Sequence, residues 1–432
     1  MIFEIITTSL MGGIALKAFI QKKGLATNDS GKIQRIISLS GLNVKDGKDT
    51  LTTQLIRKKS YEWGMEYKYR IPLGRSFDDY LTKQRILEDG LNNRRQRITM
   101  NDLKMLQLDE NIIDNLKTLF NNKITHKKEL ELSFDGLLTL RIYNEPLPTQ
   151  VAFKVGEGWE IPVGITRDKN TFRFHDFEKI PHMVLGGATR YGKSNFINSL
   201  IISLIQSNPI HTKLFLIDLK GGVELCDYEN INQTLSIAYE PYEALITLQA
   251  AYDQMRAIQS KLRSMGKKNV QEAGIKERYF IVIDEVGELN PSEAIGKEDK
   301  KLKEECQTLM SQIARLGAGL GFRQILATQY PTGDVIPRQC KQNSDAKISF
   351  RVQSATASRV VLDETGAENL PQIKGRAIYQ TADKREILQT PLMTSEIILN
   401  TLSPYIKKKE MRFEKETIEP SRGTDFVTFT KI

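Results

Sequence analysis

Cysteine, histidine and long apolar runs are all scarce in this chain of 432 residues. The three cysteines, Cys226, Cys306 and Cys340, have neither disulfide nor metal-ligand spacing, which suits a protein of a reducing cytoplasm. The four histidines fall into no His-Glu-x-x-His or similar group. We therefore expect neither a disulfide scaffold nor a metal site built from protein ligands alone.

A charge-free apolar stretch lies near the N-terminus and is short for a spanning helix. Residues 5–16 carry no charge, whereas a transmembrane helix needs about 20 apolar residues. Glu4 and Lys17 flank this run, and no small-residue cleavage site indicates a signal peptide. Two interpretations stay open: residues 1–20 anchor the protein at the inner face of the cell membrane, or they form a buried or interfacial helix. In both cases we expect the body of the protein in the cytoplasm.

Acidic residues are fewer than basic ones, which gives a formal net charge of +9. This excess favours a polyanionic partner, but it is spread over short clusters and does not identify one by itself. The content of charged residues (27%) and hydrophobic residues (40%) is that of a globular protein. The length allows two or three domains.

Composition and pattern divide the chain into four segments: the apolar residues 1–23, a linker and small α+β domain at 24–150, a larger domain at 151–400, and a charged tail at 401–432. In the second segment we expect a strand over 61–71, a helix from the N-cap Ser76 to Asn93, and a hairpin turning at Asp135-Gly136. From residue 151 strands alternate with helices, which predicts an α/β fold with a mainly parallel sheet.

Residues 187–194, Gly-Ala-Thr-Arg-Tyr-Gly-Lys-Ser, fit the phosphate-loop pattern G-x-x-x-x-G-K-[ST]. An apolar run at 182–185 predicts a strand before the loop, and helical periodicity over 195–205 predicts a helix after it. Lys193 would then reach the β- and γ-phosphates of ATP, and Ser194 would hold Mg²⁺. The alternative is a glycine-rich turn before an ordinary helix. The nucleotide-binding candidates are Gly187, Ala188, Thr189, Arg190, Tyr191, Gly192, Lys193, Ser194 and Asn195.

The apolar run 279–283 ends in two adjacent carboxylates, Asp284 and Glu285. Such a pair at a strand end, about ninety residues after a phosphate loop, is typical of a nucleotide hydrolase. We expect Asp284 to hold Mg²⁺, directly or through Ser194, and Glu285 to act as the general base on water. Strand capping is the alternative function of the two residues.

Two further predicted strands end in polar residues. Gln329 follows the run 324–328 and would sense the γ-phosphate if the sheet is wound in the usual way. Asp218 and Lys220 follow the run 214–217 on the same edge. Linkage of the nucleotide state to a moving loop and plain structural pairing are equally open for these two residues.

Five motifs occur in order over about residues 160–395: Gly-Ala-Thr-x-x-Gly-Lys-Ser-Asn, Ile-Asp-Leu-Lys, Val-Ile-Asp-Glu, Leu-Ala-Thr-Gln-x-Pro and Ser-Arg-Val-Val-Leu-Asp. Together they resemble the motor domain of the FtsK/SpoIIIE family of DNA translocases. The stretches Lys-Gly-Gly-Val-Glu-Leu and Gly-Arg-Ala-Ile-Tyr-Gln-Thr are similar to FtsK-like coupling and transfer proteins of Gram-positive conjugative elements. The resemblance implies a RecA-like P-loop motor that uses ATP and Mg²⁺ and forms a ring, expected to be a hexamer, around DNA.

Two positions depart from the family's pattern. Ala318 stands where chromosomal members have an arginine that acts on the nucleotide of a neighbouring subunit. Arg315, Arg323 or Arg359 must then replace it, and Arg323 and Arg359 rank equally. Arg190 stands where the family usually has glycine, and either contacts phosphate or points into solvent.

The resemblance implies an ATP hydrolase coupled to DNA translocation, acting as a coupling protein in conjugative transfer of plasmid or integrative-element DNA. Its partners would be DNA, further copies of itself, and relaxase and membrane channel proteins of a transfer apparatus. The alternatives are a cytoplasmic motor for plasmid partition or phage DNA handling, and a DNA-binding scaffold that recruits a relaxase complex and uses ATP only to assemble.

DNA contacts would come from loops that face the pore, and phosphate contacts there carry no sequence code. Candidates are Lys267, Lys268, Arg338 and Lys341, although solvated loops are an equal alternative. About thirty residues follow the motor, so we expect no winged-helix reader of DNA polarity.

Overall fold

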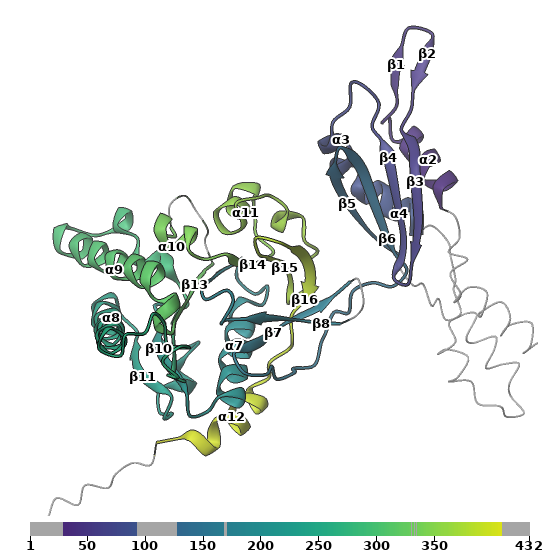
Figure 1. Cartoon of the computed structure of the whole chain (residues 1–432). Coiled ribbons are helices and arrows are strands. Elements are labelled where there is room, and N and C mark those ends of the chain that lie inside the picture. The colour runs from purple at the N-terminus through teal and green to yellow at the C-terminus, as the bar shows by residue number, and fades with distance from the viewer. Residues whose placement is uncertain are drawn as a thin grey trace, which may run out of the picture.

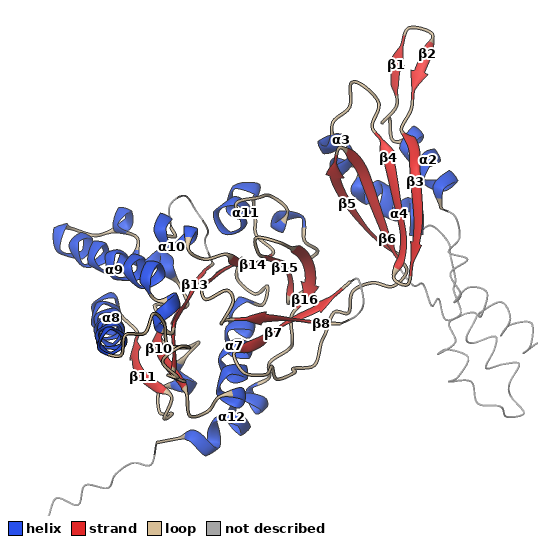
Figure 2. Ribbon diagram, in the orientation of Figure 1, coloured by secondary structure: helices blue, strands red, loops and turns tan. Residues whose placement is uncertain are grey.

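The computed structural model describes residues 29–92, 128–167, 171–329, 331, 333 and 335–407. These residues form a small unit with a four-stranded sheet and a larger unit with a ten-stranded sheet (Figures 1 and 2). The proposed anchor at 1–20 lies outside the described residues, as does most of the charged tail. No helix in the described ranges is long and apolar enough to cross a membrane.

The small unit is an antiparallel sheet in the order β3-β4-β6-β5, preceded by the separate hairpin β1-β2. Its core joins Tyr67 and Leu140 of the sheet to Ile33 and Leu87 of two helices, and all four side chains are fully buried. The elements are α2 (Ser30–Leu39), β1 (Val44–Asp46), β2 (Asp49–Leu51), β3 (Gln54–Tyr61), β4 (Gly64–Arg70), α3 (Phe77–Thr82), α4 (Gln84–Asn92), β5 (Glu129–Asp135) and β6 (Leu137–Tyr143).

Local expectations for this unit are partly confirmed. The hairpin at Asp135-Gly136 is present, and Gly136 has the left-handed φ of +69° that its turn requires. The strand expected over 61–71 is confirmed as β4, but it begins later than expected, because the chain turns after Tyr61, whose ring stacks on Trp63 at 4.9 Å, and pairs β3 with β4. Aromatic residues in a turn gave the pattern of a continuous strand.

The helix expected from Ser76 to Asn93 begins as predicted but is two helices. The Ser76 backbone N–H donates to Asp79 Oδ2 at 2.8 Å in a capping box. α3 then ends after Thr82, and α4 begins at Gln84. The start of the segment 24–150, where we expect a linker, contains α2 and the β1-β2 hairpin in its described part.

The larger unit confirms the α/β fold with a mainly parallel sheet. Six strands pair in parallel in the order β11-β10-β12-β13-β9-β14, and β15, β16, β7 and β8 continue the sheet in antiparallel pairing. The strands are β7 (Glu160–Thr166), β8 (Phe172–Asp176), β9 (Met183–Gly186), β10 (Thr212–Ile217), β11 (Thr234–Ala238), β12 (Arg278–Ile283), β13 (Phe322–Thr328), β14 (Ala346–Phe350), β15 (Arg376–Gln380) and β16 (Arg385–Gln389).

Helices cover both faces of this sheet, which explains why its central strands are apolar throughout rather than alternating. All residues of β9, β12 and β13 are buried. One face packs against α8, α9, α10 and α11, and the other packs against α7 and α12 (Figure 1). The helices are α7 (Lys193–Ser207), α8 (Pro241–Ser264), α9 (Lys297–Leu316), α10 (Arg338–Gln342), α11 (Ala355–Leu362) and α12 (Ser395–Leu402).

Glu129 of β5 connects the two units through ion pairs. Its carboxylate lies 2.8 Å from Arg167 Nη2, just after β7, and 3.7 Å from Arg376 Nη1 at the start of β15. Arg376 is fully buried and also donates to the carbonyl of Leu147 at 3.0 Å. These contacts hold the chain close to residue 150. The domain boundary that we place at this residue stays a prediction.

Candidate functional site

The carboxyl ends of the parallel strands β9, β10, β12 and β13 meet at one edge of the large sheet. The phosphate loop follows β9, and Asp218 follows β10. Asp284 follows β12, and Gln329 follows β13. Ligands of open parallel sheets bind at this edge. The structure therefore brings the predicted site residues of all four strands together.

Close packing requires glycine at both ends of the phosphate loop. A Cβ on Gly187 would lie 2.6 Å from Phe350 Cβ, and a Cβ on Gly192 would lie 2.9 Å from the Gly375 nitrogen. Gly192 also has a φ of +113°, which side chains rarely adopt. The Gly375 N–H donates to the Tyr191 carbonyl at 2.8 Å, so the start of β15 supports the loop.

The loop presents unpaired donors at the start of α7. Among the described residues, the backbone N–H groups of Arg190, Gly192, Lys193 and Ser194 have no hydrogen-bond partner. α7 is 15 residues long, and its macrodipole adds positive potential at this end. Unpaired N–H groups at a helix N-terminus bind anions such as phosphate. The N–H of Ala188 instead donates to the Arg351 carbonyl at 2.9 Å and holds the loop in place.

Lys193 and Asp284 form a buried ion pair. Lys193 Nζ lies 2.6 Å from Asp284 Oδ1 and 2.7 Å from the Asp284 carbonyl, and the side chains are 3% and 0% exposed. Asp284 Oδ2 is buried and has no hydrogen-bond partner. An orphaned carboxylate oxygen fits a Mg²⁺ ion or one of its water ligands. When ATP binds, Lys193 would exchange Asp284 for the phosphates.

Glu285 is held by three donors from two segments, the end of β13 and the loop after β10. Its Oε1 accepts from Thr328 Oγ1 at 2.7 Å. Its Oε2 accepts from the Gln329 N–H and from Lys220 Nζ, each at 2.9 Å. The Glu285 side chain is only 3% exposed. A buried carboxylate at this position fits a general base on a sequestered water.

Gln329 lies against the phosphate loop, because Thr189 Oγ1 donates to its side-chain oxygen at 3.1 Å. This contact gives the proposed γ-phosphate sensor a direct connection to the loop. Asp218 is fully buried, and its Oδ2 accepts from the N–H groups of Glu224 and Leu225 at 2.9 Å each. Asp218 therefore pairs with its own loop, and linkage of this loop to the nucleotide state stays a prediction.

One residue of the predicted set, Asn195, has other partners, whereas Ser194 lies as predicted. The Asn195 amide donates to the Pro391 carbonyl at 2.7 Å, and its oxygen accepts from the Met393 N–H at 3.0 Å. The Asn195 side chain thus fastens the segment after β16 to α7. Ser194 is partly exposed at the second position of α7, where a metal ligand is expected.

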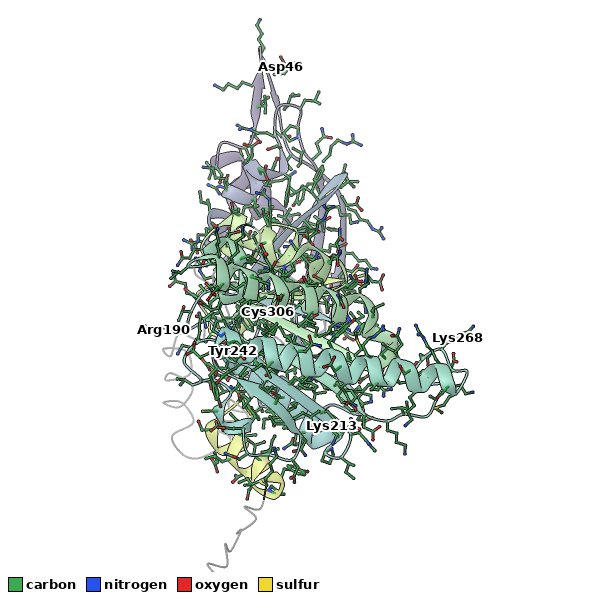
Figure 3. The ribbon with its side chains drawn as sticks, turned by 90° about the vertical axis from the view of Figure 1, so that its left-hand side faces the viewer. Asp46, Arg190, Lys213, Tyr242, Lys268 and Cys306 are labelled. Carbon is green, nitrogen blue, oxygen red and sulfur yellow. The ribbon has the colours of Figure 1, made fainter. Side chains whose placement is uncertain are left out.

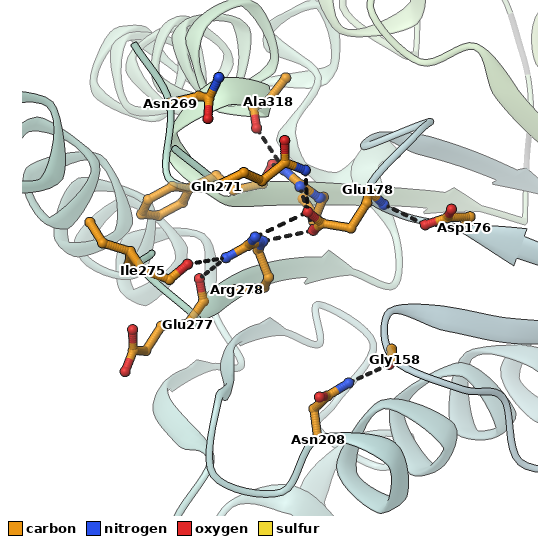
Figure 4. A network of polar contacts seen from close by, with 12 residues as sticks. Gly158, Asp176, Glu178, Asn208, Asn269, Gln271, Ile275, Glu277, Arg278 and Ala318 are labelled. Atoms are coloured by element: carbon orange, nitrogen blue, oxygen red, sulfur yellow. Dashed lines mark hydrogen bonds and ion pairs between the residues drawn. The ribbon is translucent and has the colours of Figure 1, made fainter. Parts of the chain in front are cut away.

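Arg323 is placed at the opposite edge of the sheet, and this corrects its candidacy as the arginine that acts in trans. It is the second residue of β13, only 2% exposed, and its Nη2 lies 2.9 Å from Glu178. Arg278 binds the same carboxylate through two bonds of 2.7 and 3.0 Å (Figure 4). An arginine buried in such a network cannot reach a neighbouring subunit.

Glu178 is expected to stabilise the fold at neutral pH and to lose this effect in acid. Burial raises the pKa of its carboxyl, but hydrogen bonds from Arg278 and Gln271 and the charge of Arg323 outweigh burial and hold the pKa at about 2. Because the folded pKa lies below the unfolded value of 4.5, the stabilisation is present above pH 4.5 and is lost as the pH falls towards 2.

Glu178→Gln should therefore lower the free energy of unfolding by roughly 3 kcal/mol at pH 7, since two arginines lose their counter-charge. Urea unfolding of both proteins from pH 7 to pH 2 tests this, and the difference should shrink below pH 4.5. Glu277→Gln, a nearby exposed carboxylate, serves as the control. A difference that is independent of pH would contradict the assigned role.

Arg190 has a strained backbone and no compensating contact. Its φ is +73°, which costs a non-glycine residue roughly 1–2 kcal/mol. The side chain is exposed and has no hydrogen bond or ion pair among the described residues (Figure 3). Strain without a structural partner is typical of functional loops.

Arg190→Gly should relieve this strain. We expect a free energy of unfolding higher by roughly 0.5 kcal/mol, because the gain exceeds the extra entropy of glycine in the unfolded chain. Urea unfolding without nucleotide measures it. Arg190→Ala keeps the Cβ and should show no gain. Equal stability of the two variants would mean that the loop is unstrained.

The candidate DNA contacts separate into two groups. Lys267 and Lys268 are exposed beyond the end of α8, and Figure 3 shows Lys268 on the side opposite to Arg190. Arg338 and Lys341 lie on α10, which follows β13 at the nucleotide edge. Lys341 pairs with Asp363 at 2.6 Å. The two groups therefore lie on different parts of the subunit.

The remaining arginines also lie at different edges. Arg315 is exposed near the end of α9, whose next strand begins at the edge opposite to the phosphate loop. Arg359 is exposed on α11, which follows β14 at the nucleotide edge. Arg359 is therefore the better placed of the two to reach a nucleotide held by a neighbour.

Comparison with known proteins gives consistent results. A model described as the FtsK/SpoIIIE family matches residues 159–317. DNA translocase FtsK of Caldanaerobacter subterraneus is 35% identical over 223 residues, which are 49% of this chain and 30% of that protein. DNA translocase FtsK of Helicobacter pylori is 30% identical over 261 residues, which are 57% of this chain and 29% of that protein. The chain thus matches less than a third of the length of these relatives.

Two solved structures support the fold. The pCW3 conjugation coupling protein TcpA, in a monomer form with ATPγS, has a TM-score of 0.59 at 19% identity, over 87% of this chain and 98% of that chain. ATPases 2 and 3 of EssC from Geobacillus thermodenitrificans have a TM-score of 0.51 at 17% identity, over 60% of this chain and 50% of that chain. The predicted RecA-like P-loop fold, preceded by a small domain, is confirmed.

Proposed function

We propose that this chain is an ATP hydrolase that translocates DNA, since its residues 159–317 match the model of the FtsK/SpoIIIE family. The observation that carries the proposal is the site at the carboxyl edge, where Lys193, Asp284 and Glu285 are all buried beside the phosphate loop. A protein that used ATP only to assemble would not need Glu285 as a base. Bound Mg²⁺ would supply charge neutralisation at the phosphates, with Asp284 and Ser194 as its protein ligands.

Residues of this chain have separate tasks in the proposed reaction. The N–H groups at the start of α7 bind the phosphates, and Lys193 neutralises their charge. Glu285 accepts the proton of the attacking water, and Gln329 responds to the γ-phosphate through Thr189. We propose Arg359 as the arginine supplied to a neighbouring subunit, because it is exposed at the nucleotide edge. Such an arginine is typically worth 10³–10⁵ in rate.

We further propose a role in conjugative transfer, as the coupling protein of a plasmid or integrative element, with a hexameric ring as the working form. The support is the likeness to the pCW3 conjugation coupling protein TcpA, which extends over 87% of this chain and therefore includes the small unit. Relaxase and membrane channel proteins are the partners this role requires. A cytoplasmic motor for plasmid partition or phage DNA handling remains the second candidate.

ATP hydrolysis by the full chain, with and without long duplex or single-stranded DNA, tests the proposal. We expect DNA to stimulate the rate about tenfold or more, with an effect that falls steeply with salt because the contacts are to phosphates. Hydrolysis that ignores DNA of either form would contradict a DNA motor. ATP binding without any hydrolysis would favour the assembly scaffold.

A further inference from the structure

The lone pairs of the proposed general base are largely occupied in this structure. Each carboxylate oxygen accepts about two hydrogen bonds. Oε2 of Glu285 already accepts two, from the Gln329 N–H and from Lys220 Nζ, and Oε1 accepts one from Thr328. One acceptor position is left on Oε1, and Oε2 becomes available to a water only after one of its two donors leaves.

Lys220 is the donor most able to leave. The Gln329 N–H is fixed by the end of β13, and the Thr328 hydroxyl belongs to a fully buried residue of that strand. Lys220 is instead 24% exposed and reaches Glu285 from the loop after β10. Its long side chain can exchange one anion for another without any change in the strands.

The loop that carries Lys220 is fixed at its base, and its tip is exposed at Gly221 and Val223, whereas Gly222 packs against the ring of Tyr239. Asp218 fastens both ends, since it follows β10 directly and accepts from the N–H groups of Glu224 and Leu225. Between them, Gly221 and Gly222 have left-handed φ values of +78° and +67°. The Val223 side chain beside them is 76% exposed. A ligand that presses on this tip moves the backbone next to Lys220.

We propose that Lys220 is a positioning residue that restrains Glu285 in the resting enzyme and releases it when a ligand engages the loop tip at residues 221–223. Lys220 thereby keeps ATP hydrolysis slow until the ligand binds to the loop tip. The ligand is DNA, and this identification rests on the proposed function. Its phosphates give the Lys220 ammonium an alternative anionic partner as the loop moves.

The restraint makes a specific kinetic prediction for Lys220→Ala. Glu285 keeps Thr328 and Gln329 as donors, so the buried carboxylate remains hydrogen-bonded and the fold should persist. We expect the rate without DNA to rise about tenfold, and the stimulation by DNA to shrink to about twofold or less. KM for ATP should stay unchanged, because the phosphate loop is intact. Lys220→Gln, which retains a neutral donor, should give an intermediate rate without DNA.

Two controls separate this role from others. Lys213→Ala removes a lysine at the opposite end of the same strand β10 (Figure 3) and should leave both rates unchanged. Lys220→Ala combined with Glu285→Gln should return to background, which shows that the added hydrolysis passes through Glu285. Thermal unfolding of each variant confirms that it is folded.

The outcomes distinguish the restraint from the motor itself. A Lys220→Ala enzyme with a lower rate without DNA would overturn the restraint and make Lys220 part of the catalytic machinery. Unchanged basal rate together with full DNA stimulation would overturn it as well. If wild type ignores DNA, the proposed motor fails, but the basal rate of Lys220→Ala still decides whether Lys220 restrains Glu285.

Discussion

Lys193→Ala should abolish ATP binding under ordinary conditions. Lys193 carries the one charged side chain that the phosphate-loop motif directs at the β- and γ-phosphates. Hydrogen bonds to charged groups contribute up to about 3 kcal/mol, so the affinity should fall roughly 100-fold or more. Calorimetric titration with ATPγS measures this loss.

The experiment needs a control because Lys193 also neutralises Asp284, which is fully buried. Removing one partner of a buried pair costs roughly 3 kcal/mol of stability. Lys193→Ala combined with Asp284→Asn removes the unpaired charge and should recover stability without recovering ATP binding. Normal affinity in Lys193→Ala would remove the phosphate-loop assignment.

Glu285→Gln should bind ATP normally and hydrolyse it roughly 10³-fold more slowly. The amide keeps the shape of the side chain. Its oxygen can accept from the Gln329 N–H and Lys220, and its NH2 can donate to the Thr328 hydroxyl, which is able to accept as well as donate. It cannot accept a proton from water, and a positioned general base contributes about 10²–10⁴ in rate. Single-turnover hydrolysis with radiolabelled ATP separates the chemical step from binding.

Glu288→Gln is the matched control, since Glu288 is an exposed carboxylate three residues further along the chain. This variant should turn over ATP at the wild-type rate. If Glu285→Gln also does so, another residue is the base, and the role assigned to Lys220 fails with it.

The site was predictable from the sequence because each of its parts follows an apolar strand. Parallel strands present their carboxyl ends at one edge, so a phosphate loop after β9 and two carboxylates after β12 must come together once the sheet forms. The motif supplies glycine where the loop meets Phe350 and Gly375. The apolar periodicity of the strands and the local phosphate-loop motif were sufficient to predict this site, because no contact of a long side chain had to be predicted.

Long side chains and turns were not predictable in the same way. Arg323 is a candidate in the sequence for the arginine that acts on the nucleotide of a neighbouring subunit. Its position at the beginning of β13 instead places it beside Glu178, at the edge of the sheet opposite to the phosphate loop. Asn195 fits the family's motif, yet it binds the backbone near Met393, almost two hundred residues away. The sequence shows that Lys220 follows an apolar strand. It does not predict the contact with Glu285, because that contact depends on how the glycine turn folds.

Displacement of a roadblock from DNA tests most directly whether this protein translocates along DNA. Linear duplex carrying a third strand, and single-stranded DNA carrying streptavidin on a terminal biotin, are mixed with the full chain and ATP. We expect the roadblock to be displaced from at least one substrate with ATP, and from neither substrate with ATPγS or with the Glu285→Gln variant. Rapid DNA-stimulated hydrolysis that leaves both roadblocks in place would contradict translocation as the function of this protein.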